Sequence, residues 1–74
     1  MINIDWDEYK EHKKYSGKND NFEILIDFMK SYYNIVSSSE MYETFSNDDI
    51  ALMMLEKRGI SSAEALEDYI FKLR

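Results

Sequence analysis

The sequence predicts an all-α fold: a compact bundle of four helices, with an additional short helix allowed, around a central helix over about residues 21–36. Apolar residues recur at helical spacing along most of the chain. The chain has no proline, and each of its two glycines stands where a helical pattern ends. No Asn-Gly or Asp-Gly pair favours a β-hairpin. With 74 residues, we expect one helical domain over 1–74.

The first two predicted helices each begin at an acidic cap. Asp5 is a good N-cap, and Glu8 three residues later completes a variant of the capping box. Gly17 is a natural stop for this helix. Asp20 or Asn21 caps the central helix, whose apolar arc spans roughly 200°. An arc this wide places the helix at the centre of the domain or in contact with another chain.

The serines at 37–39 should end the central helix, because their hydroxyls compete for backbone groups. A short helix over about 39–45 would then show Met41, Tyr42 and Phe45 on one side. These residues constitute the additional element of the predicted bundle.

The last two predicted helices are separated by a glycine. Ser46 is the expected N-cap of the first, and its apolar run over 50–55 should be largely buried. Gly59 fits the left-handed position after the last turn, with Ile60 folding back as the apolar partner. Ser61 and Glu64 then form a capping box for the final helix.

Composition excludes several classes of protein. Without cysteine, neither a disulfide scaffold nor a thiolate metal site can form. The net charge of −6 opposes direct binding to nucleic acid and to anionic membranes, and it favours a partner with a basic surface. The first residues carry acids where a signal peptide needs bases, and the apolar run over 50–55 is too short to cross a bilayer. We therefore expect a cytoplasmic protein.

No constellation of residues predicts catalysis. His12 is the only histidine and falls on a charged face one turn after Glu8, which suggests a solvated side chain. Carboxylate pairs are abundant but match helix caps, and a chain of this size has little material for a cleft. The glycines are isolated, and the residues 19–21 lack calcium-loop spacing. We expect no enzyme activity, no catalytic residue, no metal site and no cofactor.

Residues 55–70 superficially match a DNA-binding helix–turn–helix. The second helix would, however, present Glu64, Glu67 and Asp68 to the groove, with no base in its first two turns. An ordinary αα-hairpin fits this stretch better.

Negative charge is concentrated in the middle of the chain. Residues 20–56 carry eight acids and one base, whereas residues 1–19 carry four of each. A strip of these carboxylates could imitate a row of phosphates for a basic partner; a solvated face with helix caps is the plainer alternative. The strip would comprise Asp20, Glu23, Asp27, Glu40, Glu43, Asp48 and Asp49.

Aromatic residues, which make up 15% of the chain, are a second indication of partner binding beside the concentrated negative charge. Tyrosine and tryptophan are favoured at binding surfaces, although most aromatics at helical spacing are core. We expect the core to hold Trp6, Phe22, Phe28, Tyr32 and Tyr69. The candidates for an exposed, partner-binding patch are Tyr15, Tyr33, Tyr42 and Phe71.

These observations favour a small acidic protein-interaction module. It would inhibit or regulate a nucleic-acid-binding protein, as do phage or mobile-element proteins that disarm host defence. The alternative is a homo-oligomeric structural or assembly component of a larger particle, which the wide apolar arc of the central helix would serve.

Overall fold

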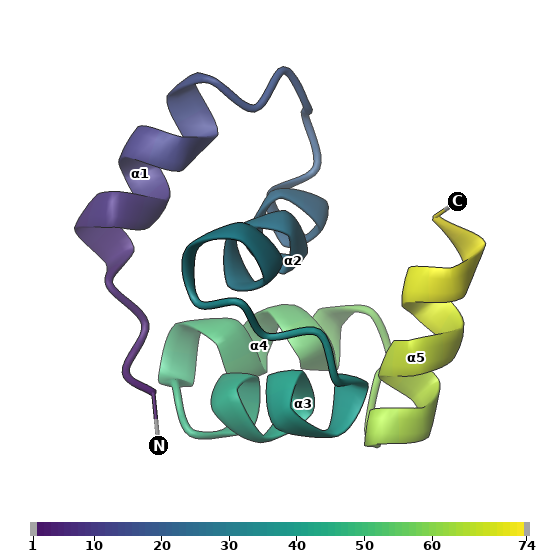
Figure 1. Cartoon of the computed structure of the whole chain (residues 1–74). Helices are drawn as coiled ribbons and strands as arrows, with labels where there is room; N and C mark the ends of the chain where they lie inside the picture. The colour runs from purple at the N-terminus through teal and green to yellow at the C-terminus, as the bar shows by residue number, and fades with distance from the viewer. Residues whose placement is uncertain (1, 74) are drawn as a thin grey trace. The chain divides into compact units, whose positions relative to one another are not determined.

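The computed structural model describes residues 2–73 and is all-helical over that range (Figure 1). Its five helices are α1 (Trp6–Lys14), α2 (Asn21–Tyr32), α3 (Ser38–Ser46), α4 (Asp49–Lys57) and α5 (Ala63–Lys72). The predicted all-α class is confirmed, and the additional short helix is present as α3. The chain divides into two compact units. One is Ile4–Val36, with α1 and α2; the other holds the described residues on either side, with α3, α4 and α5.

The unit Ile4–Val36 is a pair of packed helices joined by residues 15–20. Asp5 caps α1 as predicted, since its carboxylate accepts the N–H groups of Asp7 and Glu8, each at 3.2 Å. The Asp5 N–H, which Glu8 would bind in a complete capping box, instead donates to the Tyr33 hydroxyl at 2.8 Å. This bond ties the start of α1 to the residue that follows α2.

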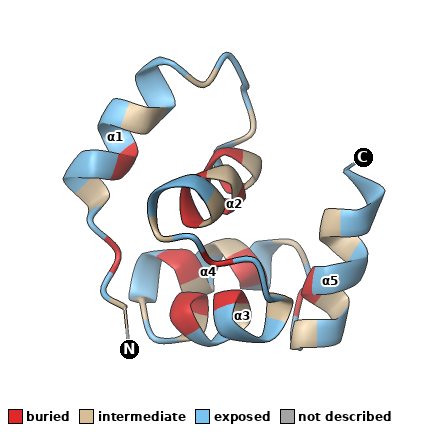
Figure 2. Ribbon diagram, in the orientation of Figure 1, coloured by how far each residue is buried: buried red, intermediate tan, exposed pale blue. Residues whose placement is uncertain are grey.

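Helix α2 is the most apolar element of this unit. Asp20 caps it by accepting the N–H groups of Phe22 and Glu23 at 2.9 and 3.3 Å. Six of its twelve residues are buried (Figure 2), and they are Phe22, Ile24, Leu25, Ile26, Phe28 and Met29. These six side chains of the wide apolar arc are therefore buried within a single copy of the chain, whereas Tyr32 and Val36 of the same arc are exposed.

The predicted end of α2 near Val36 is wrong, because the helix stops at Tyr32. Asn34 adopts a left-handed conformation, with φ of 58°, which an asparagine tolerates better than most residues. The turn lets the Ile35 N–H donate back to the Met29 carbonyl at 3.1 Å and buries the Ile35 side chain. Val36 is left exposed beyond it.

In the second unit, α3 packs against both α4 and α5. Ser37 caps α3, and its buried side chains are Met41, Thr44 and Phe45. The Ser38 hydroxyl donates to the Glu67 carboxylate at 3.3 Å and so links α3 to α5. Leu66 is the fully buried residue of α5.

The cap of α4 is Asp48, not Ser46 as predicted. Ser46 ends α3, and its hydroxyl donates to the Tyr42 carbonyl at 2.7 Å. The Asp48 carboxylate accepts the N–H groups of Ile50 and Ala51, both at 3.0 Å. A carboxylate makes charge-assisted bonds to these donors, which favours the aspartate over a serine hydroxyl.

The apolar run of α4 is less buried than expected. Ala51 and Leu55 are buried, whereas Ile50 and Met53, three residues apart on one face, are more than half exposed. The prediction for the end of α4 is confirmed. Gly59 has φ of 69°, and the Ile60 N–H donates to the Leu55 carbonyl while Ile60 itself is buried.

The cap of α5 lies one residue later than predicted. Ser62 is fully extended, and its hydroxyl accepts the Ala65 N–H at 3.1 Å. Ser61 therefore precedes the cap, and Glu64 stands in the first turn without the spacing of a capping box.

Candidate binding cleft

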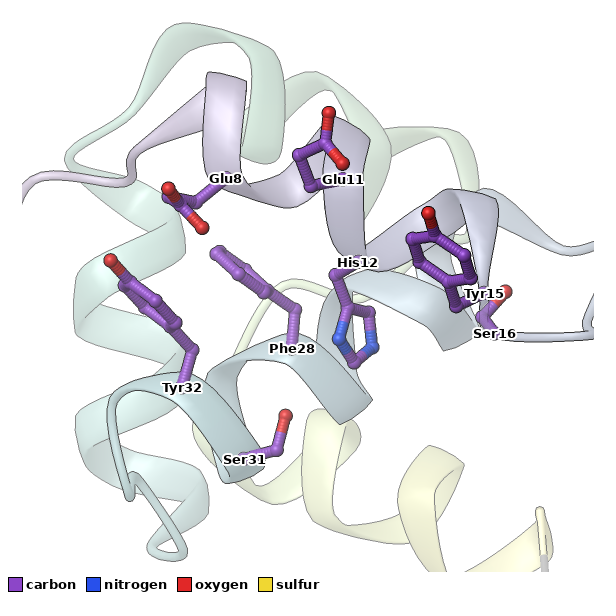
Figure 3. A pocket seen from close by; sticks show the side chains of 8 residues that line it. All are labelled: Glu8, Glu11, His12, Tyr15, Ser16, Phe28, Ser31 and Tyr32. Atoms are coloured by element: carbon purple, nitrogen blue, oxygen red, sulfur yellow. The ribbon is translucent and has the colours of Figure 1, made fainter.

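The unit Ile4–Val36 contains a cleft of about 480 Å³ between α1 and α2 (Figure 3). This volume lies within the range of ligand-binding pockets in proteins. From α1 and the turn after it come Glu8, Glu11, His12, Tyr15 and Ser16, and from α2 come Phe28, Ser31 and Tyr32. Every residue of the cleft thus belongs to one unit and one continuous stretch of chain.

Stacked aromatic rings form the α2 wall of the cleft. The rings of Phe28 and Tyr32 lie nearly parallel, with centroids 5.0 Å apart and an interplanar angle of 15°. The Phe28 ring also meets the His12 imidazole at 5.5 Å and the edge of Tyr9 at 5.9 Å. Phe28 is buried whereas Tyr32 is 52% exposed, so this wall runs from the core of the unit to its surface.

Glu8 makes the cleft electrostatically negative beside Tyr32. The charge of Glu8 is the main cause that raises the pKa of the Tyr32 hydroxyl, with smaller contributions from burial and from Asp5 and Tyr33. No hydrogen bond or ion pair within residues 2–73 engages the Glu8 carboxylate. Glu11, by contrast, forms a surface ion pair with Lys14 at 3.0 Å.

The cleft contains only one of the four aromatic residues predicted to bind a partner. Tyr15 lines it and is 84% exposed. Tyr33 is half-buried and accepts the Asp5 N–H, which makes it a structural residue of the unit. Tyr42 in α3 is half-buried, and Phe71 in α5 is 73% exposed. Both belong to the other unit, and that the four form one partner-binding patch stays a prediction.

The predicted aromatic core needs three corrections. Phe22 and Phe28 are buried as expected, but Tyr32 is exposed, and Trp6 and Tyr69 are only half-buried. Tyr32 was misplaced because its place on the apolar arc of α2 predicts burial, whereas it is the last residue of that helix. Tyr9 is the buried aromatic of α1 instead, and its hydroxyl donates to the Asn21 carbonyl at 3.0 Å.

The predicted acidic strip divides between the two units. Asp20, Glu23 and Asp27 belong to the unit Ile4–Val36, and there Lys18 forms ion pairs with both Glu23 and Asp27. The hydrogen bond to Asp27, followed by that to Glu23, raises the pKa of Lys18 above its ordinary value. Asp20 is the cap of α2. Much of this part of the strip is therefore already neutralised or used within the chain.

The remaining four acids of the strip lie in the other unit. Asp48 caps α4, while Glu40, Glu43 and Asp49 are exposed. Among the described residues, no salt bridge engages Glu40, Glu43 or Asp49. The stretch 40–56, which carries five acids, contains no lysine, arginine or histidine. That the seven acids form one continuous strip stays a prediction.

The cleft was not predicted from the sequence, because its residues on α1 match the pattern of an ordinary solvated helix face. Glu8 and His12 stand one helical turn apart on α1 and were assigned to a charged, solvated face. The structure shows His12 half-buried against Phe28, so the prediction of a solvated histidine is wrong, whereas Glu8 is exposed. Which residues of α2 would lie opposite α1 is a tertiary property that helical spacing cannot provide.

Within residues 2–73, no group of three or more histidine, aspartate or glutamate side chains is arranged to hold a metal ion. Over the same range, no helix combines the length and apolar character needed to cross a membrane. Comparison of the chain with family models, curated proteins and solved structures finds no match.

Proposed function

We propose that this chain is a non-catalytic interaction module that binds a basic surface on another protein. One observation carries the proposal: the exposed carboxylates of Glu40, Glu43 and Asp49 lie in a stretch without any basic residue, and no salt bridge within the described chain engages them. Unpaired like charges repel one another, so a basic partner would relieve that repulsion on binding.

The proposal extends to inhibition of a nucleic-acid-binding protein. Such proteins present lysine and arginine side chains to phosphates, and a carboxylate-rich helical surface would compete for the same side chains. Competition of this kind is the expected action of a phage or mobile-element protein that disarms a host defence.

The test is to capture the partner from host extract on the immobilised chain, identify it by mass spectrometry and measure its Kd. Because charge attraction is screened by salt, retention should fall steeply as NaCl is raised. The double variant Glu40→Lys with Glu43→Lys should weaken binding about tenfold, since two attractive charges become repulsive.

The matched control is Glu64→Lys with Asp68→Lys, which changes the net charge equally on exposed positions of α5. Helical content by circular dichroism should be the same for both variants. Equal weakening by the control, or retention that persists at high salt, would contradict recognition by the α3 carboxylates.

A second candidate function is self-association in a larger assembly. It is favoured by Ile50 and Met53, which are exposed on one face of α4, and less by the apolar arc of α2, six residues of which are buried. Sedimentation velocity over a wide concentration range tests it. A species that remains monomeric at the highest concentration would exclude this candidate.

A further inference from the structure

We propose that the cleft between α1 and α2 binds the guanidinium group of an arginine side chain projecting from the basic partner. This inference rests on the proposed function, because it assumes a partner with a basic surface. It goes further by naming the side chain recognised and the residues that hold it.

The walls of the cleft offer the two kinds of surface that a guanidinium group prefers. A cation is attracted to the face of an aromatic ring within about 6 Å of its centroid. Tyr15 and Tyr32 present exposed rings to the cleft, and the stacking of Tyr32 on Phe28 holds the Tyr32 ring in place. The planar guanidinium can lie flat against such a ring while its edge donates hydrogen bonds.

The carboxylate acceptors for those hydrogen bonds come from α1, opposite Tyr32 of α2 and on the same side of the cleft as Tyr15 (Figure 3). Glu8 has no ion pair or hydrogen bond to its carboxylate among the described residues, so it is available to a ligand. Glu11 is already paired with Lys14, but both side chains are largely exposed, and an arginine can compete for the carboxylate. No lysine or arginine lines the cleft.

Electrostatics and geometry agree that the occupant is a cation. The negative charge of Glu8 is felt at Tyr32 on the opposite wall, because it raises the pKa of that phenol. An anionic ligand would be repelled by the carboxylate of Glu8, which no salt bridge among the described residues engages. Arginine is favoured over lysine because the guanidinium group is planar and more weakly hydrated than an ammonium group. Moving it from water to an aromatic surface therefore costs less desolvation free energy.

The experiment is a titration of the isotope-labelled full chain with the peptide acetyl-Gly-Arg-Gly-amide, followed by NMR. We expect millimolar binding, with chemical-shift changes centred on His12, Tyr15, Phe28 and Tyr32. The same peptide with citrulline, which has the shape of arginine but no charge, should bind at least tenfold more weakly. The peptide with lysine should bind about two- to fivefold more weakly.

Two exposed positions test the assignment without threatening the fold. Glu8→Gln and Tyr15→Ala should each weaken arginine binding about two- to fivefold, as expected for one surface charge or one exposed ring. The matched controls are Glu64→Gln, which also removes a first-turn acid, and Phe71→Ala, which also removes an exposed ring. Both controls should leave the affinity unchanged.

Equal binding of the citrulline peptide would overturn recognition of a cation, and equal binding of the lysine peptide would overturn the choice of arginine. Shift changes that survive Glu8→Gln and Tyr15→Ala unaltered would overturn the cleft as the site. These results are separable from failure of the proposed function, because that function is tested by charge reversal on α3. A partner lost on Glu40→Lys with Glu43→Lys but indifferent to Glu8→Gln would retain the function and remove this inference.

Discussion

The hydroxyl of Tyr33 connects two elements through a hydrogen bond. It accepts the N–H of Asp5, the residue that caps α1, from a position just after the end of α2. Tyr33 was predicted to bind a partner, which stays a prediction, and the structure gives its hydroxyl a role within the unit as the acceptor of a backbone N–H.

We expect Tyr33→Phe to lower the free energy of unfolding by about 0.5–1.5 kcal/mol, because it removes one hydrogen bond and keeps the ring. Urea unfolding followed by circular dichroism measures this change. Tyr15→Phe is the control, since no hydrogen bond of the Tyr15 hydroxyl exists among the described residues. A Tyr33→Phe variant as stable as the wild type would show that water replaces the hydroxyl without loss.

The hydroxyl of Tyr9 makes the stability sensitive to alkaline pH. Burial, with a smaller contribution from the charge of Asp20, raises the pKa of Tyr9 above its ordinary value of 10.0. The folded protein therefore holds this proton more tightly than the unfolded chain. The resulting stability is fully present below pH 10.0 and is lost as the pH rises through the folded-state pKa.

Urea midpoints should accordingly be nearly constant from about pH 8 to 9.5 and fall above that range. The decline should be shallower in Tyr9→Phe, which is less stable at neutral pH because it loses the bond to Asn21. Tyr32 and Lys18, whose pKa values are also raised, leave a residual decline in that variant. An unchanged slope in Tyr9→Phe would count against Tyr9 as a source.

At the scale of the element, only one of the two adjacent serines before α5 caps the helix. Ser62 accepts the Ala65 N–H, whereas Ser61 lies outside the helix. We expect Ser62→Ala to cost about 1 kcal/mol of stability, the usual effect of removing an N-cap hydroxyl, and Ser61→Ala to cost almost nothing. Thermal unfolding of the two variants compares them directly. The reverse order would restore the capping box predicted from Ser61 and Glu64.

The helices could be predicted from the sequence more reliably than the positions at which they end. Four helices were predicted and the fifth, α3, was allowed as an additional short helix, because periodicity, caps and the two glycines are local signals. The end at Gly59 was correct because glycine alone adopts a left-handed conformation freely. The end of α2 was missed because an asparagine such as Asn34 is a weaker sign of a left-handed residue than a glycine. The apolar residues after Asn34 also continue the helical periodicity.

The candidate site was largely beyond the sequence for a different reason. Tyr15 was correctly predicted to be exposed. Tyr32, His12 and Glu8 come together in one cleft only because α1 and α2 pack against each other. Likewise, Lys18 in the loop before α2 pairs with Glu23 and with Asp27, which lies nine residues further along the chain. The sequence shows that charges are concentrated but not which of them are already neutralised.

At the scale of the whole molecule, the net charge of −6 acts on stability as well as on binding. Charges of one sign repel over a distance that shrinks from about 30 Å to 8 Å between 0.01 M and 0.15 M salt. We therefore expect the Tm to rise over this range of NaCl. Differential scanning calorimetry at a fixed pH measures the change.

The control is a triple variant, Glu40→Gln, Glu43→Gln and Asp49→Asn, which removes three of the six net charges and leaves −3. Its Tm should respond more weakly to salt, because less repulsion remains to be screened. A wild-type Tm that falls as NaCl is added would mean that attractive ion pairs, such as those of Lys18, outweigh the repulsion.

Both walls of the cleft come from residues 8–32, and only the six residues 15–20 separate α1 from α2. Closing so short a loop costs little chain entropy, and local pairings of helices are among the fastest to form. A ribosome synthesises the chain from its amino terminus, so every residue of the cleft has been made before translation passes Val36. The site can therefore begin to assemble on the nascent chain, ahead of α3, α4 and α5.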